Sequence, residues 1–134
     1  MATTEDIAVV VITPERQVLE DAADGVVIPA HDGEVGILRD RAALLCELGI
    51  GQLRYSRGGR TRRVFIDGGF AQVLENRVTV LTAQAVPAED VSADAVNAAE
   101  SDIDRHRGRD EESCLARERA QRRWRVLRNL STHR

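Results

Sequence analysis

The feature that most constrains the fold is a change in sequence character at Pro87. Before it, short runs of Val, Ile, Leu and Thr are separated by turn-forming residues about every 8 to 12 positions, which is typical of β-sandwiches and barrels. After it, Ala, Arg, Glu and Asp dominate with the spacing of amphipathic helices. The sequence therefore predicts two domains, a β domain over residues 1–87 and a helical domain over residues 88–134.

The first domain is expected to consist of short strands joined by tight turns. The candidate strands are rich in β-branched residues and occupy residues 7–12, 17–20, 25–29, 33–38, 50–55, 63–66, 70–74 and 77–82. The segments 57–60 and 75–76 are expected to form hairpin turns, because Gly and Asn tolerate positive φ. Gly68 and Gly69 are expected to bend a strand or to let another backbone approach.

The second domain is predicted to be a two-helix hairpin. Ser92 is a candidate N-cap for the first helix, and Gly108 interrupts the helical pattern. Asp110 then caps a second helix, whose first turn carries acidic residues as the helix dipole favours. Isolated helices of this length are marginally stable, so we expect the hairpin to need a partner surface.

Charge is unevenly distributed along the chain. All 19 basic residues are Arg, and the formal net charge is -3. The last twenty residues, however, carry seven Arg against one acid, Glu118, a formal charge of +6. Such a run indicates either a solvated helix face or a surface for an acidic partner.

No arrangement of residues predicts catalysis or a bound cofactor. His31-Asp32 is the best local pair, and a polar turn before Gly33 is the simpler interpretation. Neither a Walker-type nor a dinucleotide-binding glycine motif occurs, and the three His lack metal-ligand spacing with Cys46 and Cys114. We therefore expect a chain that is not an enzyme and has no cofactor or metal.

Several segments, taken in order, resemble the epsilon subunit of rotary F-type ATP synthase. Residues 10–15, 27–29 and 33–38 resemble the opening of that family, and residues 65–70 with 76–81 resemble its paired central strands. The resemblance extends from about Val9 to Asp90, and beyond this the likeness is one of architecture.

The resemblance implies a β-sandwich of about ten short strands followed by a C-terminal α-helical hairpin. It also implies a non-catalytic central-stalk subunit that binds the gamma subunit and the c-ring and couples them to the catalytic head. Contact with the alpha and beta catalytic subunits is implied to be conditional on the hairpin. The expected location is peripheral, on the cytoplasmic face of the bacterial inner membrane, with no insertion into the bilayer and no bound nucleic acid.

The resemblance also assigns residues to interfaces. Those expected to face the c-ring are Asp32, Glu34, Arg39 and Arg41. Those expected on the regulatory helix are Arg117, Arg119, Arg122, Arg123 and Arg125. The chain departs from the family pattern in two places. Residues 39–45 lack both of the prolines found there, which predicts a less rigid loop. Residues 91–96 lack the acid and the Arg of the family's nucleotide-sensing form, which argues against ATP sensing.

A second function class is kept as an alternative. A β-sandwich with an Arg-rich tail could recognise nucleic acid, because Arg pairs well with phosphate. Against this hypothesis, the chain as a whole is acidic and only 3% of its residues are aromatic, so few side chains are present for base stacking.

Overall fold

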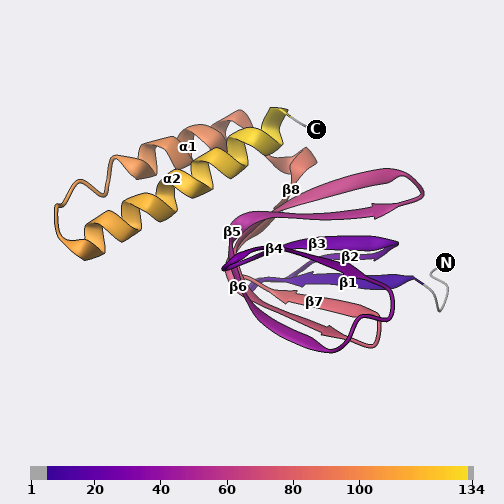
Figure 1. The fold of residues 1–134 in the computed structure, drawn as a ribbon. Coiled ribbons are helices and arrows are strands. Elements are labelled where there is room, and N and C mark those ends of the chain that lie inside the picture. Colours follow the sequence, from indigo (N-terminus) through magenta and orange to yellow (C-terminus); the bar gives the residue numbers. More distant parts are fainter. Residues whose placement is uncertain (1–5, 133–134) are drawn as a thin grey trace.

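Strands occupy the chain as far as Pro87 and helices occupy most of the remainder (Figure 1). The structure is a computed structural model that describes residues 6–132. Its strands are β1 (Ile7–Ile12), β2 (Gln17–Ala23), β3 (Gly25–Ala30), β4 (Gly33–Leu38), β5 (Leu44–Arg57), β6 (Arg60–Leu74), β7 (Arg77–Leu81) and β8 (Ala85–Pro87). The short 3₁₀ turn η1 (Ala88–Asp90) leads to the helices α1 (Ala93–Ile103) and α2 (Glu111–Thr132).

The strands form one strongly bent sheet that closes into a two-layer sandwich (Figure 1). The strand order is β2-β1-β7-β6-β5-β3-β4, and β8 pairs with β6. The pair β1 and β7 is parallel and the other pairs are antiparallel. In this order β4 and β2 are the edge strands, so β4 offers a backbone edge to a partner.

The described residues form eight strands, fewer than the expected ten or so. The expected strands at 63–66 and 70–74 are both parts of the 15-residue β6, and the one at 50–55 lies within the 14-residue β5. Gly68 and Gly69, at φ 70° and 106°, bend β6 without ending it. The expectation of a bend at these glycines is thus confirmed.

Both predicted hairpin turns are confirmed. Gly58 and Gly59 connect β5 to β6 with φ values of 60° and 83°. Glu75 and Asn76 connect β6 to β7 with φ values of 49° and 61°. Positive φ at both central residues is the geometry that matches the twist of paired strands.

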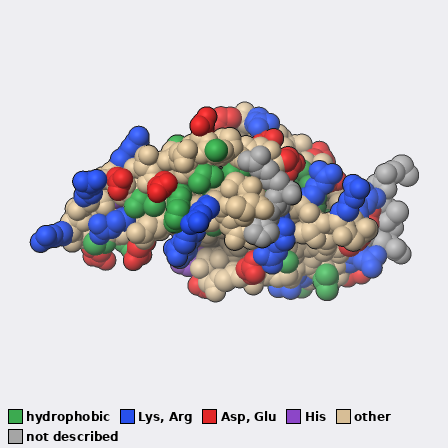
Figure 2. Space-filling view, turned by 90° about the horizontal axis from the view of Figure 1, so that it is seen from above, with side chains coloured by type: hydrophobic (Ala, Val, Ile, Leu, Met, Phe, Trp, Pro, Cys, Tyr) green, Lys and Arg blue, Asp and Glu red, His purple; other side chains and the backbone are tan. Residues whose placement is uncertain are grey.

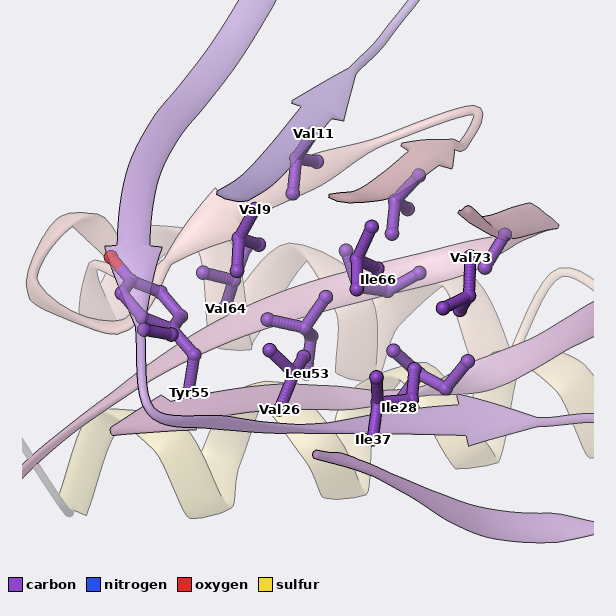
Figure 3. Close-up of a cluster of buried hydrophobic side chains, with 14 of the residues drawn as sticks. Val9, Val11, Val26, Ile28, Ile37, Leu53, Tyr55, Val64, Ile66 and Val73 are labelled. Atoms are coloured by element: carbon purple, nitrogen blue, oxygen red, sulfur yellow. The ribbon is translucent and has the colours of Figure 1, made fainter. Parts of the chain in front are cut away.

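The main core lies between the two layers and is built from aliphatic side chains (Figure 3). Val9 and Val11 from β1 face Leu53 from β5 and Ile66 from β6 across this space. All four side chains are fully buried. Alternation along each strand sends these residues inward, as a half-buried strand requires.

The predicted two-helix hairpin is also confirmed, together with both of its caps. The Ser92 hydroxyl accepts a hydrogen bond from the Ala95 amide at 3.1 Å. The Asp110 carboxylate accepts one from the Ser113 amide at 3.3 Å, and hydrogen bonds from Ser113 lower the pKa of Asp110. Each cap satisfies an amide that would otherwise lack a partner at a helix start.

Candidate functional site

The residues expected to face the c-ring do not form one loop. In the β3–β4 hairpin, Gly33 pairs with Ala30 at one end and Leu38 pairs with Gly25 at the other. Asp32 therefore lies at one end of β4, whereas Arg39 and Arg41 follow its opposite end. A six-residue strand is about 20 Å long, so these residues are distributed along the β4 edge.

Glu34 and Arg41 are each held by neighbours on this edge. The Glu34 carboxylate accepts hydrogen bonds from the two terminal nitrogens of Arg54, at 2.7 and 3.3 Å. The Arg41 guanidinium reaches back along β4 and donates to the Gly36 carbonyl oxygen at 3.4 Å. Arg54 thus offsets the charge of Glu34, while Arg41 brings a positive charge towards the middle of the strand.

The loop after β4 is tied to the β6–β7 turn. The Asp40 amide donates to the Asn76 side-chain oxygen at 2.6 Å, and the Asn76 side-chain nitrogen donates to the Asp40 carboxylate at 3.3 Å. Asp40 has φ 62°, a conformation that Asp tolerates better than most residues. These reciprocal bonds constrain a loop that was expected to be less rigid because it lacks two prolines.

An apolar patch on the outer face of the sandwich was missed by the sequence analysis. Phe70 on β6 and Leu81 on β7 are cross-strand partners, and each is more than half exposed. Leu45 on β5 extends the patch and is 72% exposed. A groove of about 400 Å³ adjoins it and is lined by Ile12, Thr13, Pro14, Leu81, Thr82 and Ala83. We call Leu45, Phe70 and Leu81 the apolar patch.

A sequence signal for the apolar patch exists. Residues 70–74 read Phe-Ala-Gln-Val-Leu. Ala71 and Val73 face the core, yet Phe70 and Leu74 on the solvent-facing side of the same strand are also apolar. An apolar residue on the outer face of an antiparallel strand departs from the usual alternation and indicates a contact surface.

The Arg residues of α2 do not form one uniform array. Arg119, Arg122 and Arg125 are exposed, whereas Arg117 is half-buried and donates to the Cys114 sulfur at 3.4 Å. Arg123 faces the sandwich and makes an ion pair with Asp67 at 2.9 Å. On the face seen in Figure 2, basic and acidic side chains are interspersed, including over the hairpin. Arg134, which contributes to the +6 charge of the last twenty residues, lies outside the described residues.

A further titratable side chain, Tyr55, is perturbed by its surroundings. Burial and the neighbouring Asp21 raise the pKa of Tyr55 to about 12, so its hydroxyl stays protonated and donates to Asp21 at 3.1 Å. Within residues 6–132, no group of His, Cys, Asp and Glu could hold a metal ion. None of the helices described here combines the length and apolar character that a membrane crossing requires.

Comparison with known proteins decides the family. Residues 6–88 match the family described as the β-sandwich domain of the ATP synthase delta/epsilon chain. The chain belongs to this family. The match includes all eight described strands, so the family is assigned on the sandwich that carries the apolar patch and the β4 edge.

Two relatives named ATP synthase epsilon chain illustrate the similarity. The protein from Symbiobacterium thermophilum is 49% identical over 87 residues, which cover 64% of this chain and 63% of the relative. The protein from Desulfitobacterium hafniense strain Y51 is 40% identical over 89 residues, covering 66% of this chain and 67% of the relative. The chain thus spans slightly less than two thirds of the first of these relatives.

The fold is shared more widely than the sequence. A chain in the structure of the mitochondrial ATP synthase of Euglena gracilis superposes with a TM-score of 0.77 at 24% identity, over 93% of this chain and 81% of that one. A chain from the structure of the central stalk and c-ring of the Tetrahymena thermophila mitochondrial ATP synthase superposes with a TM-score of 0.65 at 15% identity. The superposition covers 92% of this chain and 94% of that one. These coverages include the helices, so the hairpin belongs to the shared fold.

Proposed function

We propose that this chain is a non-catalytic rotor subunit in the central stalk of a proton-translocating ATP synthase. The observation that carries the proposal is the family match over residues 6–88. In this role the sandwich couples the gamma subunit and the c-ring to the catalytic head, whose active sites lie on other subunits. The nucleic-acid-binding alternative gains no support from the matching family.

The apolar patch is the proposed contact for the gamma subunit. Contiguous exposed apolar side chains usually mark interaction surfaces. Phe70 and Leu81 form a cross-strand pair at the centre of the patch, and burying such side chains stabilises an interface by about 25 cal/mol for each Å². Aromatic side chains at such a centre often dominate the binding energy.

The β4 edge is the proposed contact for the c-ring. The expected contact residues are the same as before, Asp32, Glu34, Arg39 and Arg41, but they act along an edge strand rather than from one loop. Edge strands carry unpaired backbone groups that a partner can cover. Cysteines at positions 34 and 41 should therefore both crosslink to c subunits in the intact enzyme, and absence of both products in coupled enzyme would contradict the assignment.

The hairpin is the proposed site of conditional contact with the alpha and beta subunits. Arg119, Arg122 and Arg125 are exposed and available to acidic segments of a partner. Each exposed ion pair contributes about 0 to 1 kcal/mol, so inhibition would need several acting together. We place the assembled protein peripherally, on the cytoplasmic face of the bacterial inner membrane.

Purification of the native complex tests the rotor role. The tagged chain should copurify with gamma and c subunits. Phe70→Ser should lower the recovery of gamma by at least about tenfold if it removes a central contact. Leu115→Ser is the matched control, because Leu115 is also exposed but lies on α2. Equal recovery of gamma with both variants would contradict the assigned patch. Retention of the chain on DNA at physiological salt, without gamma or c subunits, would contradict the rotor role itself.

Truncation tests the conditional contact. Removal of the chain after Gly108 should leave assembly and coupling intact and raise ATP hydrolysis, and Arg122→Gln with Arg125→Gln should reproduce part of the rise. High salt should act in the same direction, because exposed pairs are screened within about 8 Å at physiological ionic strength. If the truncated enzyme hydrolyses ATP at the rate of the intact enzyme at every salt concentration, the exposed Arg residues are only a solvated helix face.

A further inference from the structure

The side chain of Arg123 is directed at the sandwich rather than at solvent. Its Nε donates to Oδ2 of Asp67 on β6 at 2.9 Å, across 56 residues of sequence. The Asp67 side chain is only 15% exposed, and that of Arg123 is 31% exposed. Charge-assisted hydrogen bonds at such sheltered positions are stronger than exposed ion pairs.

Asp67 is held rigidly for this contact. Its amide donates to the Thr82 hydroxyl at 3.2 Å and to the Gln84 carbonyl oxygen at 3.1 Å. It immediately precedes the bend at Gly68 and Gly69, and both bonds tie its amide to the segment 82–84. The backbone that carries the carboxylate is therefore fixed by contacts within the sandwich.

Arg123 lies on the docking face of α2. Leu127 and Leu130 follow it by four and seven residues, the spacing of one helix face, and both are buried. They pack with Phe65, Ala88 and Val91 in a second, smaller cluster. Towards the start of α2 the hairpin projects away from the strands (Figure 1). Arg123, Leu127 and Leu130, which contact the sandwich, lie in the C-terminal half of the helix.

An unfavourable group lies under the same helix. Gln52 on β5 is the cross-strand partner of Phe65, and its Oε1 is buried without a hydrogen-bond partner in the described part of the chain. A buried acceptor without a partner opposes the state that buries it. The packing of Leu127 and Leu130 on Phe65, with Val96 and Ala99 of α1 partly buried beside them, acts in the opposite direction and favours docking.

We propose that Asp67 and Arg123 form a clasp that holds the hairpin against the sandwich, and that the unpartnered oxygen of Gln52 opposes it. These three side chains then shift the balance between docked and released hairpin, in which the apolar contacts of Leu127 and Leu130 also favour the docked state. In the docked state Arg123 is occupied by Asp67, so it joins the exposed Arg residues of α2 only after release. Breaking the clasp therefore both frees the helix and adds a positive charge to it.

Hydrogen exchange of the isolated full chain measures the clasp. Asp67→Asn and Arg123→Gln should each speed exchange of the amides of residues 120–130 by about fivefold to tenfold, as loss of a charge-assisted bond predicts. The double variant should exchange no faster than either single one, because both remove the same bond. Gln52→Leu should slow the same amides. Arg125→Gln is the matched control, with the same charge change at an exposed position of α2.

The amides of β1 report on the sandwich in the same experiment and should exchange alike in all variants. Effects of Asp67→Asn and Arg123→Gln that add in the double variant, or an equal effect of Arg125→Gln, would overturn the clasp. Faster exchange in β1 together with α2 would also overturn it, since the sandwich itself would then be destabilised. The measurement needs no other subunit, so its failure is distinguishable from failure of the rotor role.

Discussion

Among residues 6–132, seventeen buried side chains fill the space between the layers of the sandwich, whereas five form the cluster that joins the hairpin to it. The larger cluster draws on strands from both layers, so each residue is supported from several directions. The smaller one depends on Leu127 and Leu130 of α2 meeting Phe65 of β6. Regions with few buried contacts open at lower free energy than the core. The sandwich is therefore expected to be the more stable part of the chain and the hairpin the part that opens first.

The largest expected effect of a single substitution lies in the sandwich. A side chain added at Gly69 would overlap the Leu81 carbonyl oxygen, and the φ of 106° is unfavourable for any residue with a Cβ. Gly69→Ala should lower the free energy of unfolding by about 4 kcal/mol, measured by denaturant titration. Gly36→Ala is the control, because an added Cβ there meets nothing within 4 Å. Equal midpoints for the two variants would show that β6 can straighten without loss.

The next effect separates the hairpin from the sandwich. Leu130→Ala removes a fully buried side chain and should weaken docking by about 3 kcal/mol. Amide exchange in α2 should therefore speed up greatly while the thermal transition of the strands stays in place. Leu115→Ala, at an exposed position of the same helix, should change neither. If Leu130→Ala also lowered the thermal transition of the strands, sandwich and hairpin would unfold as one unit.

An alkaline pH effect is expected in the sandwich. Burial, and to a smaller extent the nearby Asp21 carboxylate, raise the pKa of Tyr55 to about 12. In the unfolded chain the pKa of a tyrosine is about 10. The folded chain holds this proton longer, so stability is complete below about pH 10 and falls by about 2 kcal/mol as the pH rises to 12. Tyr55→Phe should flatten this slope. Both proteins would carry Cys46→Ala, because burial also raises the pKa of that thiol.

The smallest effect concerns the start of the hairpin. Ser92→Ala removes the cap on the Ala95 amide and should destabilise α1 by about 1 kcal/mol, seen as faster amide exchange in its first turn. Ser101→Ala changes the same residue type at an exposed interior position and should leave those amides unaffected. If the two variants behave alike, packing on α2 rather than the cap determines where α1 begins.

Local structure was predictable wherever one residue type is required. Gly58-Gly59 and Asn76 indicated turns because positive φ favours them, and Ser92 and Asp110 indicated helix starts because their oxygens accept from free amides. The family resemblance likewise rested on ordered segments of the sandwich. The local pattern divided β6 into two strands, at 63–66 and 70–74, because a glycine bend and a strand end look alike at Gly68. The count of about ten strands came from the family resemblance and was too high for the described residues.

The sequence by itself determined the change from strands to helices at Pro87, the turns and the helix caps, because these depend on neighbours a few positions apart. Only the tertiary structure decided that Asp32 and Arg41 lie towards opposite ends of one edge, that Phe70 and Leu81 meet in an exposed patch, and that Arg123 pairs with Asp67. Each of these results depends on strand register or on helix docking. Contacts across 11 to 56 residues are set by the packing of whole layers, which no local pattern encodes.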